Sequence, residues 1–221
     1  MDRRFVALLL VIIVGFAGFL LFRKDSTTLN SAVSNHTVNG SAAIKLVEYG
    51  DFQCPACGGF HPIVEQLREK YGDKLSFTFR HFPIDSIHPH ARAASRAAEA
   101  AGNQGKFFEM YNLLYQNQSS WSGSNAASST FEGYAAQLGI DVARFKSDVT
   151  SDSVNGTINA DIEEGKDKGI TGTPAFLLNG KELANTDINT IDGFSKVIDA
   201  ALQASATPQT SAETSTAPSS N

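Results

Sequence analysis

The two cysteines of the chain are separated by two residues, in the order Cys54-Pro55-Ala56-Cys57. Upstream, the largely apolar run from Ile44 to Tyr49 predicts a short strand, and Pro55 is typical of the first residue of a helix. Cys54 would then lie at the N-terminus of that helix, where backbone N–H groups and the helix dipole favour the thiolate, the nucleophilic form of cysteine. Cys57, one turn further on, is placed to form a disulfide with Cys54 or to attack a mixed disulfide. The spacing therefore favours redox chemistry.

Two other uses of this spacing stay open at this point. His61 lies four residues after Cys57, so Cys54, Cys57 and His61 form a conceivable metal-binding set, although a closed tetrahedral site needs a fourth ligand. A purely structural disulfide is the second alternative, but closing so short a loop removes little entropy from the unfolded chain. We expect no bound metal ion, and no cofactor besides the redox-active disulfide of Cys54 and Cys57.

Composition limits the class of protein. The 221 residues are 42% hydrophobic, which is ordinary for a globular domain with a sizeable core. A net charge of −5 and a pI near 5.5 provide no basic field, so we expect no nucleic-acid partner. Two cysteines are too few to hold together a disulfide-rich secreted scaffold. The stability of the fold must therefore come from packing.

The chain begins with a segment that fits a membrane. Residues 5–22 contain no charged residue and are flanked by Arg3-Arg4 and Arg23-Lys24. At about 1.5 Å per residue, a helix of this length nearly spans a hydrocarbon core of about 30 Å. We interpret residues 1–24 as a retained single-pass anchor, with a cleaved signal followed by secretion as the alternative. The flanking charges tie, so orientation rests on the redox chemistry, which places the C-terminal domain on the oxidising, extracytoplasmic side.

The remaining chain divides into three further parts. Residues 25–41 are rich in Ser, Thr and Asn and predict a flexible tether. Residues 42–203 carry the periodic apolar pattern of a folded domain, within which residues from about 86 to 150 predict helices alone. Residues 204–221 lack bulky apolar side chains and predict a disordered Ser/Thr/Pro-rich tail.

Inside the domain, the order of predicted elements begins strand, helix, strand. The helix runs from Cys54 to about Lys70, and the alternation of Leu75, Phe77 and Phe79 with polar residues predicts the next strand. A right-handed crossover would make the two strands parallel. Further on, Asn179-Gly180 predicts a tight hairpin turn between a short strand at 176–178 and a partner at 181–184.

These features together resemble the DsbA-like branch of the thioredoxin-fold thiol-disulfide oxidoreductases, over about residues 38–203. The resemblance is carried by Leu46-Val47-Glu48-Tyr49-Gly50-Asp51-Phe52-Gln53-Cys54-Pro55-Ala56-Cys57, Pro62, Gly105-Lys106-Phe107-Phe108-Glu109-Met110 and Gly172-Thr173-Pro174-Ala175-Phe176. It implies an α/β thioredoxin-like fold, with a mixed central sheet flanked by helices and an inserted α-helical subdomain over the active site. One N-terminal transmembrane helix would precede this domain.

The resemblance also assigns roles to individual residues. Cys54 would be the attacking thiol and Cys57 the resolving one. Thr173 and a cis Pro174 would face the sulfurs and bind an extended substrate peptide by strand addition.

Further roles follow from the same resemblance. Pro55 and Ala56 would also contact substrate. Glu48 matches an acidic residue that moves the proton of the inner cysteine; a solvated glutamate on an exposed strand face is the alternative.

The implied activity is disulfide formation in reduced or unfolded exported polypeptides. A membrane partner, quinone-linked and of the DsbB or VKOR kind, would then reoxidise the cysteine pair. Two departures from the family pattern leave a reductase or isomerase as the alternative: Pro55-Ala56 contains no histidine, and Thr173 is common to several branches of the fold. A non-enzymatic binding or metal-binding module is the remaining hypothesis.

Overall fold

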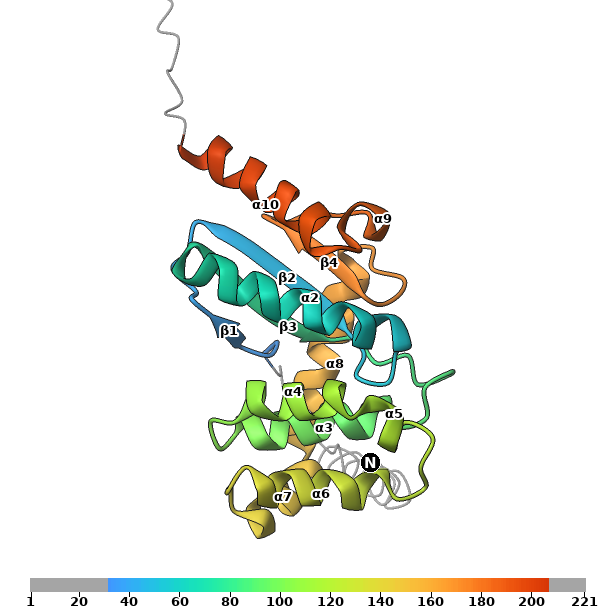
Figure 1. The fold of residues 1–221 in the computed structure, drawn as a ribbon. Coiled ribbons are helices and arrows are strands. Elements are labelled where there is room, and N and C mark those ends of the chain that lie inside the picture. Colours follow the sequence, from blue (N-terminus) through green and yellow to red (C-terminus); the bar gives the residue numbers. More distant parts are fainter. Residues whose placement is uncertain (1–31, 207–221) are drawn as a thin grey trace, which may run out of the picture. The chain divides into compact units, whose positions relative to one another are not determined.

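The computed structural model describes residues 32–206 (Figure 1). The predicted membrane anchor at residues 1–24 and residues 207–221 of the predicted tail lie outside this range. Within residues 32–206, no helix has both the length and the apolar character needed to cross a membrane.

In the described part of the chain, five strands form one mixed sheet in the order β1-β3-β2-β4-β5. Their bounds are β1 (His36–Val38), β2 (Ile44–Gly50), β3 (Leu75–His81), β4 (Ala175–Leu178) and β5 (Lys181–Glu182). Strands β2 and β3 pair in parallel, as the strand-helix-strand order predicts, and the other three pairs are antiparallel. The predicted hairpin is also present: β4 and β5 pair antiparallel and are joined by Asn179 and Gly180. Both turn residues have positive φ, +50° and +83°, as a tight two-residue turn requires.

The helices fall into those that cover the sheet and those inserted after β3 (Figure 1). Near the sheet are α2 (Pro55–Tyr71), the 3₁₀ turn η1 (Gly72–Lys74), α8 (Asp152–Asp167), α9 (Asn185–Ile188) and α10 (Ile191–Ala206). The inserted group is α3 (Ala91–Gly102), α4 (Phe107–Gln116), α5 (Gln118–Trp121), α6 (Ala127–Gln137) and α7 (Val142–Val149). Helix α8 contacts both β3 and α3, so it joins the inserted helices to the sheet.

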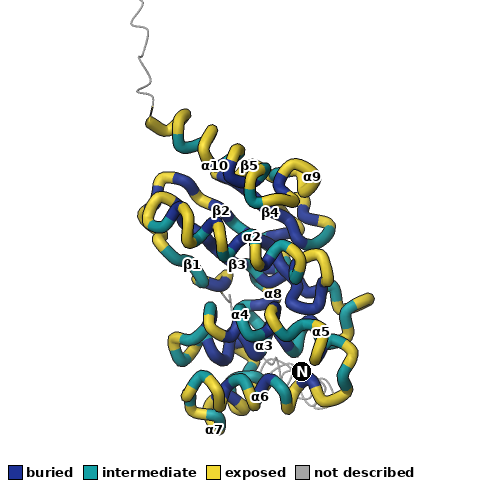
Figure 2. The backbone as a smooth tube through the Cα atoms, viewed as in Figure 1, coloured by how far each residue is buried: buried dark blue, intermediate teal, exposed yellow. Residues whose placement is uncertain are grey.

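Alternation along β2 builds the core on both faces of the sheet. Ile44 and Leu46 are fully buried on the face that carries α2 and α10. Tyr49 points to the other face, where it packs with Phe82 beside Gly165 of α8. Figure 2 shows the buried residues running through the sheet and along the facing sides of the helices. This double burial fixes β2, and with it the loop that follows, in the middle of the domain.

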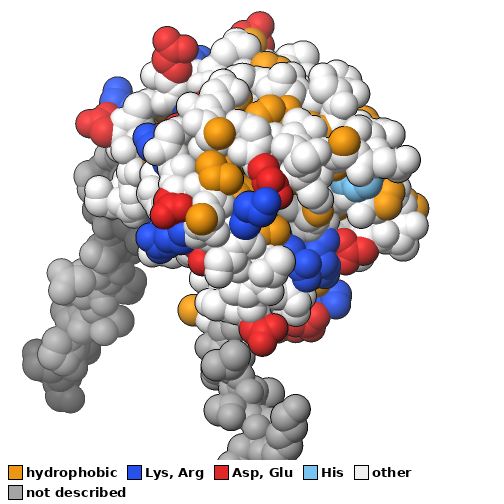
Figure 3. Space-filling model, turned by 90° about the horizontal axis from the view of Figure 1, so that it is seen from below, with side chains coloured by type: hydrophobic (Ala, Val, Ile, Leu, Met, Phe, Trp, Pro, Cys, Tyr) orange, Lys and Arg blue, Asp and Glu red, His pale blue; other side chains and the backbone are white. Residues whose placement is uncertain are grey.

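The face of the domain that points downward in Figure 1 carries charges of both signs. Figure 3 shows acidic and basic side chains interspersed on that face. This distribution agrees with the net charge of −5 for the whole chain. It gives no support to a phosphate-backbone partner there.

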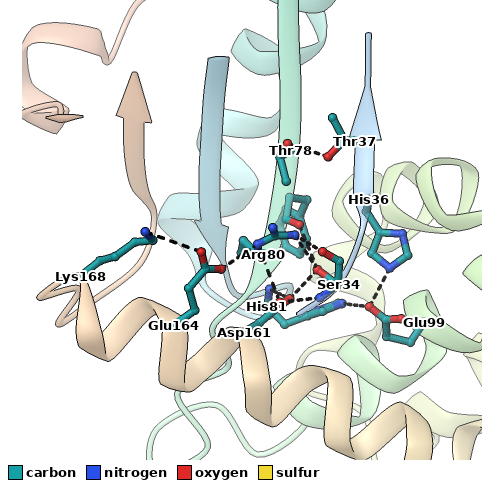
Figure 4. A network of polar contacts seen from close by, with 11 residues as sticks. Ser34, His36, Thr37, Thr78, Arg80, His81, Glu99, Asp161, Glu164 and Lys168 are labelled. Carbon is teal, nitrogen blue, oxygen red and sulfur yellow. Dashed lines mark hydrogen bonds and ion pairs between the residues drawn. The ribbon is translucent and has the colours of Figure 1, made fainter. Parts of the chain in front are cut away.

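The prediction of a flexible tether over residues 25–41 is wrong for the part that includes residues 36–38. His36, Thr37 and Val38 form the edge strand β1 and pair with β3, and Ser34 just before them is buried. The Ser34 hydroxyl and backbone N–H both donate to the Asp161 carboxylate, at 2.6 and 2.8 Å (Figure 4). A three-residue strand is too short to show an alternating apolar pattern, so its Ser/Thr/Asn composition alone suggested a linker.

Candidate active site

Cys54 is the N-cap residue of α2, with an extended backbone (φ −66°, ψ 120°), and Pro55 follows as the first helical residue. The link from β2 is short, and the N–H of Cys54 donates to the carbonyl oxygen of Asp51 at 3.1 Å. Pro62 lies inside the same helix. The local sequence therefore places the sulfur of Cys54 where the free N–H groups of the first helical turn converge.

The Cys54 sulfur is set up to carry negative charge. A hydrogen bond from the Cys57 thiol, with further ones from the backbone N–H groups of Cys57 and Ala56, lowers the pKa of Cys54 to about 5, against the opposing effect of burial. Thr173 also lowers this pKa, although its buried hydroxyl has no geometrically well-formed hydrogen bond to a described residue. The Cys54 Sγ lies 3.5 Å from the carbonyl oxygen of Thr173. At neutral pH Cys54 is a thiolate, the form that attacks disulfides.

Cys57 behaves in the opposite way. Its side chain is fully buried, and burial raises its pKa well above the usual value, with the hydrogen bond to Cys54 and the charge of Glu48 adding to the effect. Both cysteines are free thiols in the structure. The pair therefore consists of one ionised sulfur near the surface and one neutral sulfur beneath it.

Glu48 lies in β2 with 1% of its surface exposed, so the alternative of a solvated strand glutamate is wrong. Burial raises its pKa to about 8, while a hydrogen bond from the Tyr111 hydroxyl to Oε2 (3.3 Å) acts in the other direction. Its Oε1 has no hydrogen-bond partner among the described residues. A carboxyl group of this kind exchanges a proton near neutral pH, and it interacts electrostatically with Cys57.

The peptide bond between Thr173 and Pro174 is cis, as the resemblance implies. It directly precedes β4, and the carbonyl oxygen of Pro174 accepts a hydrogen bond from Asn185 Nδ2 at 2.9 Å. Pro55 and Ala56 are exposed, and Thr173 is half-buried. Pro174 itself is buried, so the accessible residues beside Cys54 are Pro55, Ala56 and Thr173. The role of all four residues in binding substrate stays a prediction.

The conceivable metal set of Cys54, Cys57 and His61 is not assembled. His61 is buried, and its Nε2 is hydrogen-bonded to Asn112 Oδ1 at 2.9 Å. Within residues 32–206, these three side chains do not form a group whose ligand atoms converge.

The cysteine-bearing loop is held by a set of residues that the sequence alone did not reveal. The Asp51 carboxylate is fully buried and accepts from the backbone N–H groups of Gln53 (2.8 Å) and Ile84 (2.9 Å) and from His88 Nδ1 (2.6 Å). From α5, the Gln118 side-chain amide donates to the carbonyl oxygens of Phe52 and Cys54, at 2.7 and 2.8 Å. Asp51 lies in the motif that carries the resemblance, and His88 lies beside Pro89, where it could shape a cleft, but neither residue was assigned a role from the sequence. Gln118 lies in a Ser/Asn-rich stretch without any distinguishing pattern.

Comparison with known proteins supports the fold. The family model described as Thioredoxin matches residues 34–200. The chain is similar to BdbD from Bacillus subtilis, with a TM-score of 0.65, 20% sequence identity and coverage of 79% of this chain and 100% of that chain. It is also similar to alpha-DsbA1 from Wolbachia pipientis, with a TM-score of 0.65, 23% sequence identity and coverage of 74% of this chain and 87% of that chain.

Curated relatives were found among larger proteins. The Na(+)/H(+) antiporter NhaA 1 of Salinispora arenicola is 36% identical over 140 residues, which are 63% of this chain and 21% of the antiporter. The antiporter NhaA 1 of Mycolicibacterium gilvum is 37% identical over 142 residues, with 63% and 22% covered. The chain thus spans about a fifth of the length of these curated relatives. Because the Thioredoxin model matches most of its length, and the sheet, the cis-proline and the cysteine-capped helix all agree with that match, the chain belongs to the thioredoxin family.

Proposed function

We propose that this protein is an extracytoplasmic thiol-disulfide oxidoreductase of the DsbA-like kind that forms disulfides in exported proteins. The observation that carries the proposal is the asymmetry of the cysteine pair, in which the pKa of Cys54 is about 5 and that of Cys57 is raised. Stabilising the Cys54 thiolate stabilises the reduced pair, and a stable reduced form makes the disulfide an oxidant. Reference pKa values for the attacking cysteine are about 3.5 in DsbA and about 7 in thioredoxin.

The proposed reaction passes two electrons from the substrate to the pair. A substrate thiolate attacks Sγ of Cys54, a new S–S bond forms, and the Cys54–Cys57 bond breaks with Cys57 leaving as a thiolate. Cys57 then takes up a proton, for which Glu48 with a pKa of about 8 is the nearby donor. A second substrate thiolate attacks the substrate's own sulfur in the mixed disulfide. The products are a substrate disulfide and the Cys54 thiolate.

The surround of Cys54 suits polypeptides as substrates. The backbone of Thr173 lies beside the sulfur of Cys54, with 3.5 Å between the Thr173 carbonyl oxygen and Sγ. Pro55 and Ala56 add small, exposed and uncharged side chains. Backbone pairing selects an extended chain without selecting its sequence. We therefore propose reduced, still flexible exported polypeptides as the substrate class.

We further propose that the chain is anchored by residues 5–22 and is reoxidised by a quinone-linked membrane partner of the DsbB or VKOR kind. The uncharged run of residues 5–22 supports the anchor. The two-electron balance supports the partner, because each turnover leaves the pair reduced and an electron acceptor must restore the disulfide. The transport activity of the antiporter relatives is not proposed, since the chain covers about a fifth of their length.

The direction of electron flow is tested by equilibrating the full-length protein with glutathione buffers of known potential. We expect a reduction potential closer to that of DsbA, about −120 mV, than to that of thioredoxin, about −270 mV. A potential near the thioredoxin value would contradict the oxidase and favour a reductase.

The roles of the two sulfurs are tested with variants and a chemically reduced, unfolded secreted protein as substrate. Cys54→Ser should abolish turnover. When Cys57→Ser is given the same protein with its disulfides intact, the Cys54 thiolate should attack a substrate disulfide and accumulate as a mixed disulfide, visible by non-reducing electrophoresis, because no Cys57 thiol is left to release it. Turnover in Cys54→Ser would refute the assignment.

A further inference from the structure

Two histidines and a glutamate from three different elements meet at one point, and none of them takes part in the thiol site (Figure 4). His36 comes from β1, His81 from the end of β3 and Glu99 from α3. The Nε2 atoms of both histidines lie 2.7 Å from Oε1 of Glu99. Each of the three residues offers one potential ligand atom to a metal ion, and these three atoms all lie within 4.8 Å of one another.

The donor set has a defined chemical preference. Two imidazole nitrogens and one carboxylate oxygen suit Zn²⁺ and related divalent transition metals, whereas Ca²⁺ and Mg²⁺ prefer oxygen ligands alone. We propose that His36, His81 and Glu99 bind a divalent transition-metal ion of the Zn²⁺ class, with water completing its coordination. The ion would tie the sheet to the inserted helices.

The surrounding charges favour a cation. In Figure 4 the carboxylates of Asp161 and Glu164 pair with Arg80, and Glu164 also pairs with Lys168, whereas Glu99 pairs with no Arg or Lys among the described residues. Asp161 is fully buried and Glu99 nearly so.

An ion can reach the group from solvent. His36 lines a surface pocket of about 330 Å³ between β1 and the start of α4, together with Asn35, Gly102 and Phe107. The imidazole of His36 stacks on Phe107 with ring centroids 3.4 Å apart, which holds its nitrogens toward Glu99. Deeper in, His81 is fully buried and its Nδ1 has no hydrogen-bond partner in the described part of the chain.

Binding requires a small rearrangement. Metal bonds of about 2.0–2.1 Å at tetrahedral angles separate donor atoms by about 3.3 Å. The two imidazoles must therefore move several tenths of an ångström from their present contacts with Glu99. Such a movement is available to His36, because β1 is a three-residue edge strand.

The experiment uses the full-length chain without a polyhistidine tag, in its oxidised form so that the sulfurs of Cys54 and Cys57 are occupied by their disulfide. Co²⁺ is titrated and its visible absorption bands are recorded, and Zn²⁺ is then added as competitor. We expect one equivalent of Co²⁺, displaced by Zn²⁺ but not by Ca²⁺. Since the partly exposed His36 is the ligand least involved in the core, His36→Ala is the main variant, and it should weaken binding more than about tenfold.

Two further variants and a stability measurement make the outcome decisive. Glu99→Gln keeps the size of the side chain but removes its charge and should also weaken binding, whereas His90→Ala, outside the group, should bind as the unaltered chain does. Zn²⁺ should raise the Tm of the unaltered chain but not that of His36→Ala. Absence of Co²⁺ bands, or equal binding by His36→Ala, would overturn the proposal and leave the group as a hydrogen-bonded cluster. Circular dichroism without metal shows whether His36→Ala is folded.

Discussion

Cys54 becomes a stable thiolate without a histidine between the cysteines. The sequence left its redox poise open because Pro55-Ala56 offers no charged or ring N–H donor. In the structure, the neutral Cys57 thiol and the backbone N–H groups of Cys57 and Ala56 supply the missing hydrogen bonds, and Thr173 contributes from the opposite side. The low pKa thus rests first on the Cys57 thiol and then on the backbone N–H groups of the first helical turn, and neither depends on the side chains at positions 55 and 56.

The low pKa of Cys54 predicts how its alkylation depends on pH. The rate at which iodoacetamide modifies Cys54 in the reduced protein should rise with a midpoint near pH 5 and stay level from about pH 6.5 to pH 8, because the thiolate is then fully formed. Cys57 should remain unmodified over the same range, since burial raises its pKa and covers its sulfur. Peptide mass spectrometry after timed labelling measures both rates.

The same shift has a consequence for folding. The pKa of Cys54 falls from the ordinary value of 9.0 to about 5 on folding, so its contribution to the stability of the reduced protein is fully present above pH 9 and is lost as the pH falls through 5. The unfolded chain is the control for the labelling experiment. In denaturant, the alkylation rates of both cysteines should rise with midpoints near pH 9, the ordinary pKa of a cysteine. A midpoint of 8 or higher for Cys54 in the folded protein would contradict the assignment.

At the scale of elements, two glycines allow close approach around the sheet. A Cβ on Gly50, at the end of β2, would lie 2.4 Å from the Phe79 ring and 3.0 Å from Oε1 of Glu48. A Cβ on Gly165 of α8 would lie 2.8 Å from the Phe82 ring and 3.1 Å from Tyr49. The first glycine makes room beside the buried carboxyl group, and the second lets α8 pack directly on the sheet.

Gly165→Ala should therefore destabilise the protein. Forcing a methyl group into the buried cluster of Tyr49 and Phe82 costs about 1–3 kcal/mol, which outweighs the gain of up to about 1 kcal/mol in helix propensity. Urea unfolding followed by circular dichroism measures the difference. Gly133→Ala in the exposed part of α6 is the matched control, because its Cβ meets nothing within 4 Å and it should be neutral or slightly stabilising. Equal effects of the two variants would show that α8 does not pack closely on the sheet.

Sequence periodicity predicted the elements well where apolar residues alternate or recur over several turns. β2, α2, β3 and the Asn179-Gly180 turn all lie close to their predicted places. Strand β1 was missed because three residues carry no period, and α5 because its four residues share the composition of a loop. The thiol site was predicted because its chemistry is concentrated in one motif and one X-Pro bond.

The histidine-glutamate group was not predicted, since its members are far apart in the chain and join only through the tertiary fold. His36 and Glu99 are separated by 63 residues. No spacing rule connects such residues, and the expectation of no metal ion rested on the C-x-x-C motif and His61 alone. The proposed site at His36, His81 and Glu99 replaces that expectation with a testable one.

At the scale of the whole described domain, the inserted helices are connected to the active-site loop through Gln118. Its amide donates to the carbonyl oxygens of Phe52 and Cys54, and a Cβ on Gly58 would lie 2.6 Å from its Oε1, so α5 sits directly on the first turn of α2. The insertion therefore covers one side of the helix that carries Cys54, and α8 joins it to the sheet from the other side.

Gln118→Ala should lower the free energy of unfolding by about 1–2 kcal/mol, because two hydrogen bonds are lost. The carbonyl oxygen of Cys54 keeps the N–H of Gly58 as a donor, so the larger loss is at Phe52. It should also speed hydrogen exchange in residues 117–126 while leaving α6 and α7 unchanged, since the loss is local. Mass spectrometry of exchanged peptides measures this effect. The exposed Gln137→Ala is the control and should change neither quantity. Unaltered exchange in residues 117–126 would mean that Gln118 does not hold the insertion on the loop.

The sheet ends in very short strands, and this matters for a protein proposed to work among unfolded chains. The edge strands β1 and β5 have three and two residues, and β5 consists of exposed Lys181 and Glu182. Unpaired strand edges recruit other chains in edge-to-edge aggregation, and short, charged edges resist this. A client chain that meets either edge finds too little backbone to extend the sheet. The domain is thus protected against being aggregated by its own substrates.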